Sequence, residues 1–153
     1  MKHCEVSQLF FRETYTVPAE QTARRLFRLL PHGEAYAERM VDAMATGYLV
    51  SVLESICARE MQPHLDPNEE TIVGSSVQFR HHAPIPPGAL VTVNGWVVGL
   101  GDHEATFWVQ ASDEHEAVCE GQIRLSVVPR SQIEQRLQRK CDAIGRRELF
   151  AGA

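Results

Sequence analysis

Residues 45–58 read Ala45-Thr46-Gly47-Tyr48-Leu49-Val50-Ser51-Val52-Leu53-Glu54-Ser55-Ile56-Cys57-Ala58, and Glu54 is the one charged residue among them. The large apolar side chains of this run fall all around a helical wheel, which predicts a helix buried on every side. A carboxylate is almost never fully buried unless it is paired. Glu54 therefore needs either a partner residue or a wet pocket. It is a structural carboxylate in the first case and a candidate catalytic group in the second.

The chain before this helix predicts a strand, a shorter helix and a connector. Aromatic and β-branched residues predict a strand over 9–17, which a proline closes. Apolar residues at helical spacing predict a helix over 19–30. From 31 to 42 apolar residues are scattered among charges, which suggests a short amphipathic lid or connector that is held loosely enough to move.

The chain after the helix changes to a period of two, which is typical of strands. The long helix is expected over about 43–61 and a last helix over about 131–142, capped by Ser131. Between them the expected strands are 71–83, 90–98, 104–111 and 117–128. The predicted class is therefore α+β. A long buried helix wrapped by a curled antiparallel sheet is the hot-dog architecture, and its open side needs further layers or a second subunit.

The length and charge of the chain narrow the function further. With 153 residues we expect one domain, 1–153, with its core at about 9–128. The net charge of −5 gives no general basic field for nucleic acid or an anionic membrane. The basic residues near the C-terminus alternate with acidic ones, as on a solvated helix face. No secretion signal or membrane span is recognised, so we expect a cytoplasmic protein with no nucleic-acid or membrane partner.

The cysteines and histidines do not predict a metal or disulfide site. The four cysteines lie far apart and form no CxxC pair, so reduced structural cysteines are expected. His81 and His82 are neighbours in an expected strand, where adjacent side chains point to opposite faces and do not easily share a metal. We expect no metal and no redox cofactor.

Several short pieces of the sequence occur in an order that resembles a known family. They are Ala45-Thr46-Gly47, Glu54 eight positions after the threonine, Val73-Gly74-Ser75, the segment from His81 to Pro86-Pro87-Gly88, and Arg124 in the last expected strand. Over about residues 17–140 this set resembles the hot-dog acyl-CoA thioesterases, in particular the group of fluoroacetyl-CoA thioesterases. Single pieces such as Thr-Gly are common, but the ordered set is fairly specific.

The resemblance implies a division of roles among these residues. Thr46, Glu54 and His81 would form the reactive group. The residues that would contact the substrate are Gly47, Gly74, Arg124, Met40 and Tyr36. The resemblance also implies a homodimer with an acyl-CoA substrate, so that coenzyme A enters as part of the substrate.

Thioester hydrolysis explains why such residue types are needed. It requires a nucleophile, a group that moves protons and a donor for the oxyanion. Glu54 would attack directly or act as a general base on water. His81 suits proton transfer near neutral pH. Thr46 and Glu54 lie about 12 Å apart along a helix, so side chains and substrate must bridge them.

Each candidate also has a purely structural interpretation. Thr46 could cap or kink the start of the helix, and Gly47 could allow tight helix packing. His82 competes with His81 for the same role. Arg124 could be the counter-ion of Glu54.

One difference from the family limits how far its function extends to this chain. Members selective for fluoroacetate carry phenylalanines before the Thr-Gly pair, where this chain has Ala37 and Met40. We therefore expect no fluorine selectivity, but hydrolysis of a small or medium acyl group. The alternatives are a non-catalytic acyl-ligand binding protein and a hot-dog hydratase or dehydratase.

Overall fold

The computed structural model describes residues 1–151, except for the side chains of residue 3 and of residues 145–151. Its helices and strands follow the order α1 (His3–Val6), β1 (Phe10–Thr16), η1 (Ala19–Gln21), α2 (Ala23–Arg28), α3 (Glu34–Ala37), α4 (Thr46–Met61), η2 (Gln62–His64), β2 (Glu70–His81), β3 (Leu90–Gly101), β4 (Glu104–Ser112), β5 (Ala117–Pro129) and α5 (Arg130–Ala151).

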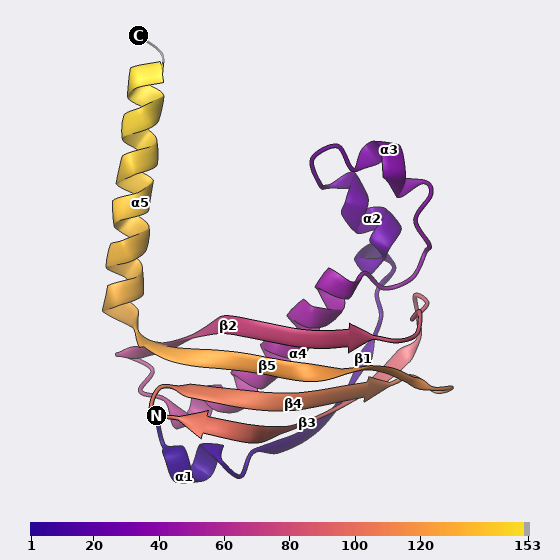
Figure 1. Ribbon diagram of the computed structural model, residues 1–153, viewed down its shortest axis with the longest axis horizontal. Coiled ribbons are helices and arrows are strands. Elements are labelled where there is room, and N and C mark those ends of the chain that lie inside the picture. Colours follow the sequence, from indigo (N-terminus) through magenta and orange to yellow (C-terminus); the bar gives the residue numbers. More distant parts are fainter. Residues whose placement is uncertain (152–153) are drawn as a thin grey trace.

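One curled antiparallel sheet carries the fold, with α4 against its concave face (Figure 1). The strand order is β1-β3-β4-β5-β2, so β1 and β2 are the two edges. Alternate residues of the central strands, such as Phe107 and Ile123, are fully buried and pack into the same core as Leu49 and Leu53 of α4. This is the predicted α+β hot-dog architecture.

Helix α4 is buried on one face and open on the other. Leu49, Leu53 and Met61 are at most 1% exposed, whereas Gly47 and Ser51 are exposed. The expectation of burial on every side is therefore wrong for a single chain. The physical reason is that the sheet ends at β2, so nothing in the described residues covers the far side of the helix.

The expected helix over 19–30 is also interrupted. Thr22 has an extended backbone, and it separates the short turn η1 from α2. Its hydroxyl caps α2 by accepting a hydrogen bond from the amide of Arg25 at 3.4 Å. Thr22 also forms a β-bridge with Met44 and is fully buried. This threonine therefore ties the segment before α4 to the start of α2, which a helical pattern alone does not predict.

Two arms project from the sheet on the side of β2 (Figure 1). One is the pair α2–α3, which stands over the end of the sheet where α4 begins. The other is α5, which leaves the end of β5 and continues to Ala151, beyond the expected end near 142. The short helix α1 was not predicted, and β3 continues three residues past its expected end.

The four cysteines fall into two pairs by exposure. Cys57 and Cys119 are buried, and burial raises the pKa of each thiol to about 12. Cys4 and Cys141 are exposed, and all four thiols are free. The buried pair is thus held in the unreactive neutral form at ordinary pH.

Candidate functional site

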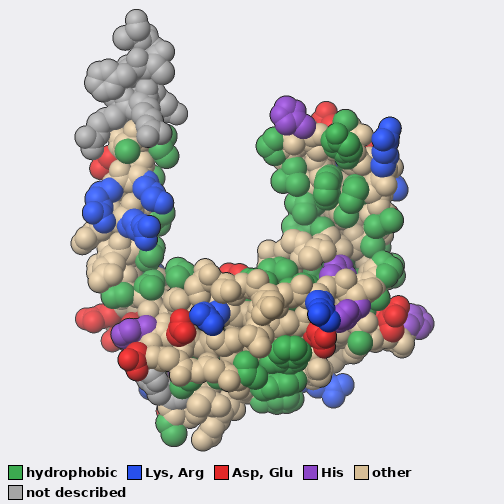
Figure 2. All heavy atoms as spheres, viewed as in Figure 1, with side chains coloured by type: hydrophobic (Ala, Val, Ile, Leu, Met, Phe, Trp, Pro, Cys, Tyr) green, Lys and Arg blue, Asp and Glu red, His purple; other side chains and the backbone are tan. Residues whose placement is uncertain are grey.

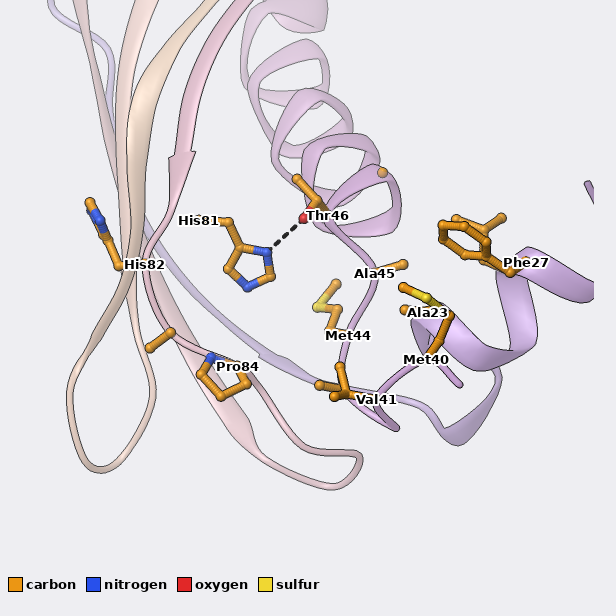
Figure 3. Close-up of a pocket in the computed structure, with 14 residues that line it drawn as sticks. Ala23, Phe27, Met40, Val41, Met44, Ala45, Thr46, His81, His82 and Pro84 are labelled. Carbon is orange, nitrogen blue, oxygen red and sulfur yellow. Dashed lines mark hydrogen bonds between the residues drawn. The ribbon is translucent and has the colours of Figure 1, made fainter. Parts of the chain in front are cut away.

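A cavity of about 480 Å³ lies between the first turn of α4, the end of β2 and helix α2 (Figure 3). Its lining residues are Ala23, Leu26, Phe27, Met40, Val41, Ala43, Met44, Ala45, Thr46, Gly47, His81, His82, Ala83 and Pro84. Most of them are apolar. The polar side chains gather where α4 meets β2, so the cavity has one polar end and one apolar end.

The polar end is built around a contact between Thr46 and His81. Thr46 Oγ1 and His81 Nδ1 are 2.9 Å apart, within hydrogen-bond distance. Thr46 is the first residue of α4 and His81 the last of β2, so one bond joins the ends of two elements 35 positions apart in the chain. His81 faces α4 because it pairs with buried Cys119, on the concave side of the sheet.

The second ring nitrogen of His81, Nε2, is the atom that is free to exchange a proton with a ligand. His81 Nε2 is buried and has no hydrogen-bond partner among the described residues. A buried polar atom without a partner is costly, so this position calls for a water or substrate atom. Burial lowers the pKa of His81 below its ordinary 6.5; the nearby backbone of Ala83 opposes this shift, and neighbouring His82 adds to it. His81 is thus neutral at pH 7 and able to exchange a proton through Nε2.

The start of α4 adds backbone donors to the same end of the cavity. Ala45 is the N-cap residue and offers no side-chain acceptor to the first turn. The first amides of a helix have no partner within it, and they favour negative charge. Thr46 and Gly47 both line the cavity, so their amides are candidates to stabilise an oxyanion. A Cβ added at Gly47 would meet only Leu26 Cδ2, at an ordinary 3.8 Å, so tight packing within this chain does not explain this glycine.

Glu54 lies on α4 two turns beyond the cavity, against the backbone of Gly74. A Cβ added at Gly74 would stand 2.5 Å from Glu54 Oε1. The absence of a side chain at position 74 is therefore what makes room for this carboxylate. Glu54 is half-buried and forms no hydrogen bond or ion pair with the described residues. No arginine among the described residues pairs with Glu54, so an ion pair does not account for this carboxylate in the single chain.

The structure separates the predicted site residues into groups. Thr46, Gly47, His81 and Met40 line the cavity together, and Glu54 and Gly74 contact each other outside it. His82 also borders the cavity, but its side chain points to the other side of the strand (Figure 3). There its ring lies 3.7 Å from Glu120.

Arg124 and Tyr36 lie away from these groups. Arg124 stands between buried Ile123 and Leu125 on β5, so its side chain is on the convex face, 3.9 Å from Glu104. It is not the counter-ion of Glu54. Tyr36 is 59% exposed on α3 and does not line the cavity.

Sequence reasoning missed the apolar wall opposite Thr46. Leu26 and Phe27 of α2 and Val41 and Met44 of the following segment face the cavity. The spacing of Leu26 and Phe27 predicted a helix over 19–30, and the cavity occupies part of its apolar side. Phe27 supplies an aromatic ring to the wall although Ala37 and Met40 are not aromatic.

Among the residues whose side chains the structure describes, 1–2 and 4–144, no group of three or more His, Cys, Asp or Glu is placed to hold a metal ion. The same part of the chain has no helix both long and apolar enough to cross a membrane.

Comparison with known proteins shows one consistent similarity. Residues 32–131 match the model of the fluoroacetyl-CoA-specific thioesterase family, FlK. A fluoroacetyl-CoA thioesterase from Streptantibioticus cattleyicolor is 28% identical over 133 residues, which cover 87% of this chain and 92% of the relative.

Solved structures agree with this similarity. A structure of the fluoroacetyl-CoA thioesterase FlK is 26% identical, with a TM-score of 0.78, and the match covers 87% of this chain and 95% of that one. A hypothetical protein of Thermus thermophilus, described as a thioesterase superfamily member, shares the fold at 23% identity, with a TM-score of 0.74 and coverage of 90% and 96%.

The environment of His81 predicts its titration. Because burial disfavours the charged ring, His81 should remain neutral as the pH falls through 6.5 and become protonated below that value. The ring resonances in an NMR titration measure this directly, and the spectrum of His81→Asn assigns them. A His81 pKa at or above 6.5 would contradict the geometry described.

Proposed function

The chain belongs to the family of fluoroacetyl-CoA-specific thioesterases, and from this premise we propose that it hydrolyses an acyl-CoA thioester at the cavity beside Thr46 and His81. The products are a free acid and coenzyme A. The observation that carries this proposal is the contact between Thr46 and His81 at the polar end of an otherwise apolar cavity. Such a cavity takes up an apolar acyl group and leaves the reacting carbonyl among polar groups.

Each polar group has a role in this reaction. The amides at the start of α4 stabilise the oxyanion that forms when the carbonyl is attacked. His81 Nε2 accepts a proton from the attacking water or returns one to the leaving thiolate. The hydroxyl of Thr46 holds the ring of His81 in place through Nδ1.

Glu54 is the proposed nucleophile or general base. It lies eight residues, about 12 Å of helix rise, from Thr46, and both must act at the same thioester carbonyl, so within one chain the side chains would have to bridge that distance. Alternatively, the carboxylate acts on a substrate held by a second copy. Gly74 supports the role of Glu54 indirectly, because its lack of a side chain leaves space for the carboxylate.

We propose a homodimer, formed at β2 and the open face of α4. β2 is a twelve-residue edge strand, and five consecutive residues, Gly74 to Gln78, are exposed. A long uncovered edge strand is a template for pairing with another chain. On the adjacent face of α4, Gly47, Ser51 and Ser55 recur every four residues, and such small residues allow a second helix to approach.

The proposed reaction uses no resident metal or redox cofactor, and coenzyme A is part of the substrate. The acidic balance of the chain, −5, favours neither nucleic acid nor an anionic membrane as partner. We propose that the protein acts in the cytoplasm. Arg124 and Tyr36 could contact the coenzyme A portion only from outside the cavity.

The first test is a panel of acyl-CoAs assayed by release of free thiol. Wild-type protein should hydrolyse one acyl class, and Glu54→Gln should lower kcat by about 10²- to 10⁴-fold while binding is kept. Glu60→Gln, on the same helix, is the matched control and should keep its activity. If folded wild-type protein releases no thiol from any acyl-CoA, the thioesterase proposal is wrong and a ligand-binding function replaces it.

Gly74→Ala tests whether the space at Gly74 serves Glu54. The new Cβ would displace a flexible carboxylate rather than backbone, so the fold should survive while kcat falls at least about tenfold. The neighbouring Ser76→Ala should keep full activity. In the Glu54→Gln background, Gly74→Ala should cause little further loss, because the group it displaces is already inactive. An equal loss in both backgrounds would contradict this role.

Val77→Glu tests the proposed interface. Val77 is 42% exposed on the edge strand, and a charge there should shift the protein from dimer to monomer at micromolar concentration. Sedimentation equilibrium measures this. Val98→Glu, at a 50% exposed valine on β3, should remain a dimer. A monomeric wild-type protein would exclude the dimer.

A further inference from the structure

The lining of the apolar end of the cavity indicates which kind of acyl group fits there. Away from Thr46 and His81 the wall consists of small or apolar side chains, with Phe27 and Met40 at the α2 side (Figure 3). None of the described residues that line the cavity is Lys, Arg, Asp or Glu. A charged acyl group, such as one ending in a carboxylate, would therefore lose its hydration without gaining a partner.

Backbone hydrogen bonds hold this wall in place before any substrate binds. The amide of Ala23 donates to the carbonyl of Ala43 at 2.8 Å, and the amide of Ala45 to the carbonyl of Gln21 at 2.9 Å. The amide of Met44 donates to the carbonyl of Ile85, the residue after cavity-lining Pro84, at 2.8 Å.

A side chain adds to this bracing: the guanidinium of Arg24 donates twice to the carbonyl of Met40, at 3.3 and 3.2 Å. The wall is thus fixed at its backbone. The charge of Arg24 is directed to that carbonyl rather than to the cavity.

The cavity is far larger than a two-carbon acyl group requires. At about 480 Å³ it falls within the range of pockets that take whole small-molecule ligands. A short acyl group would leave water against the apolar wall, whereas each further methylene removes apolar surface from water. Met40 and Met44 are flexible and adapt their shape to an equally flexible chain.

We propose that the preferred substrate is an uncharged, medium-chain acyl-CoA, whose acyl chain runs from Thr46 and His81 towards Phe27 and Met40. This inference rests on the proposed thioesterase function and specifies its substrate. Met40 and Val41 limit the length of chain that fits, and the thioester carbonyl stays at the polar end. The aromatic ring of Phe27 packs beside the chain.

A series of straight-chain substrates tests the proposal. With acetyl-, butyryl-, hexanoyl-, octanoyl- and decanoyl-CoA, kcat/KM should rise about fourfold per methylene, which corresponds to about 0.8 kcal/mol, until the cavity is full. Succinyl-CoA should be poorer than butyryl-CoA, which has the same number of carbons. The proposal is overturned if acetyl- or fluoroacetyl-CoA equals or exceeds hexanoyl- and octanoyl-CoA. Hydrolysis of acetyl-CoA alone would leave the thioesterase function intact, whereas no hydrolysis of any member would refute that function.

Substitutions in the cavity wall test whether the preference for longer acyl chains arises at this wall. Met40→Trp fills the apolar end, and the ratio of kcat/KM for octanoyl- over acetyl-CoA should fall at least tenfold. Val41→Trp, at a 66% exposed position on the cavity rim, should act in the same direction without a risk to folding. Leu29→Trp is the control, because Leu29 is 76% exposed next to α2 and does not line the cavity. An unchanged ratio in the Val41 variant, or an equal fall in the Leu29 variant, would overturn the proposal.

Discussion

The packing of one apolar face of α4 into the concave sheet is the interaction on which the site depends. Leu49 and Leu53 anchor the helix among the central strands, and this fixes both its position and its rotation. Thr46 therefore lies at the end of β2, within hydrogen-bond distance of His81. The same rotation turns Glu54 towards Gly74 rather than into the core. A buried leucine pattern thus decides where the polar chemistry can occur.

The sequence predicts the parts of this structure whose periodicity is strong. The change to a period of two after residue 70 predicted the strands of the sheet, and the apolar run predicted α4. The same alternation explains Arg124: its apolar neighbours Ile123 and Leu125 place it on the convex face, a conclusion available from the pattern but obscured by the family resemblance. Position 22 was not predictable, because a threonine inside a helical pattern gives no sign of its bridge to Met44.

The cavity wall shows why a site is harder to predict than a fold. Leu26 and Phe27 have the spacing of core residues, and only the path of residues 40–45 decides that they face a cavity instead. Similarly, the far side of α4 looks like the side of a fully buried helix in sequence, yet a single chain leaves it open. Figure 2 shows that the space above the edge of the sheet, between α5 and the pair α2–α3, is also left unfilled by the described residues. An apolar pattern predicts that a helix face is buried, but it does not predict which element or subunit covers that face.

The distribution of the cysteines bears on how this protein must be handled. A thiol-reactive dye that reports coenzyme A release will also react with Cys4 and Cys141, while Cys57 and Cys119 stay silent. The enzyme therefore contributes a fixed background of two equivalents per chain in the folded state. Unfolding exposes Cys57 and Cys119 and raises this background to four equivalents per chain. The reading without substrate therefore also measures the fraction of unfolded protein.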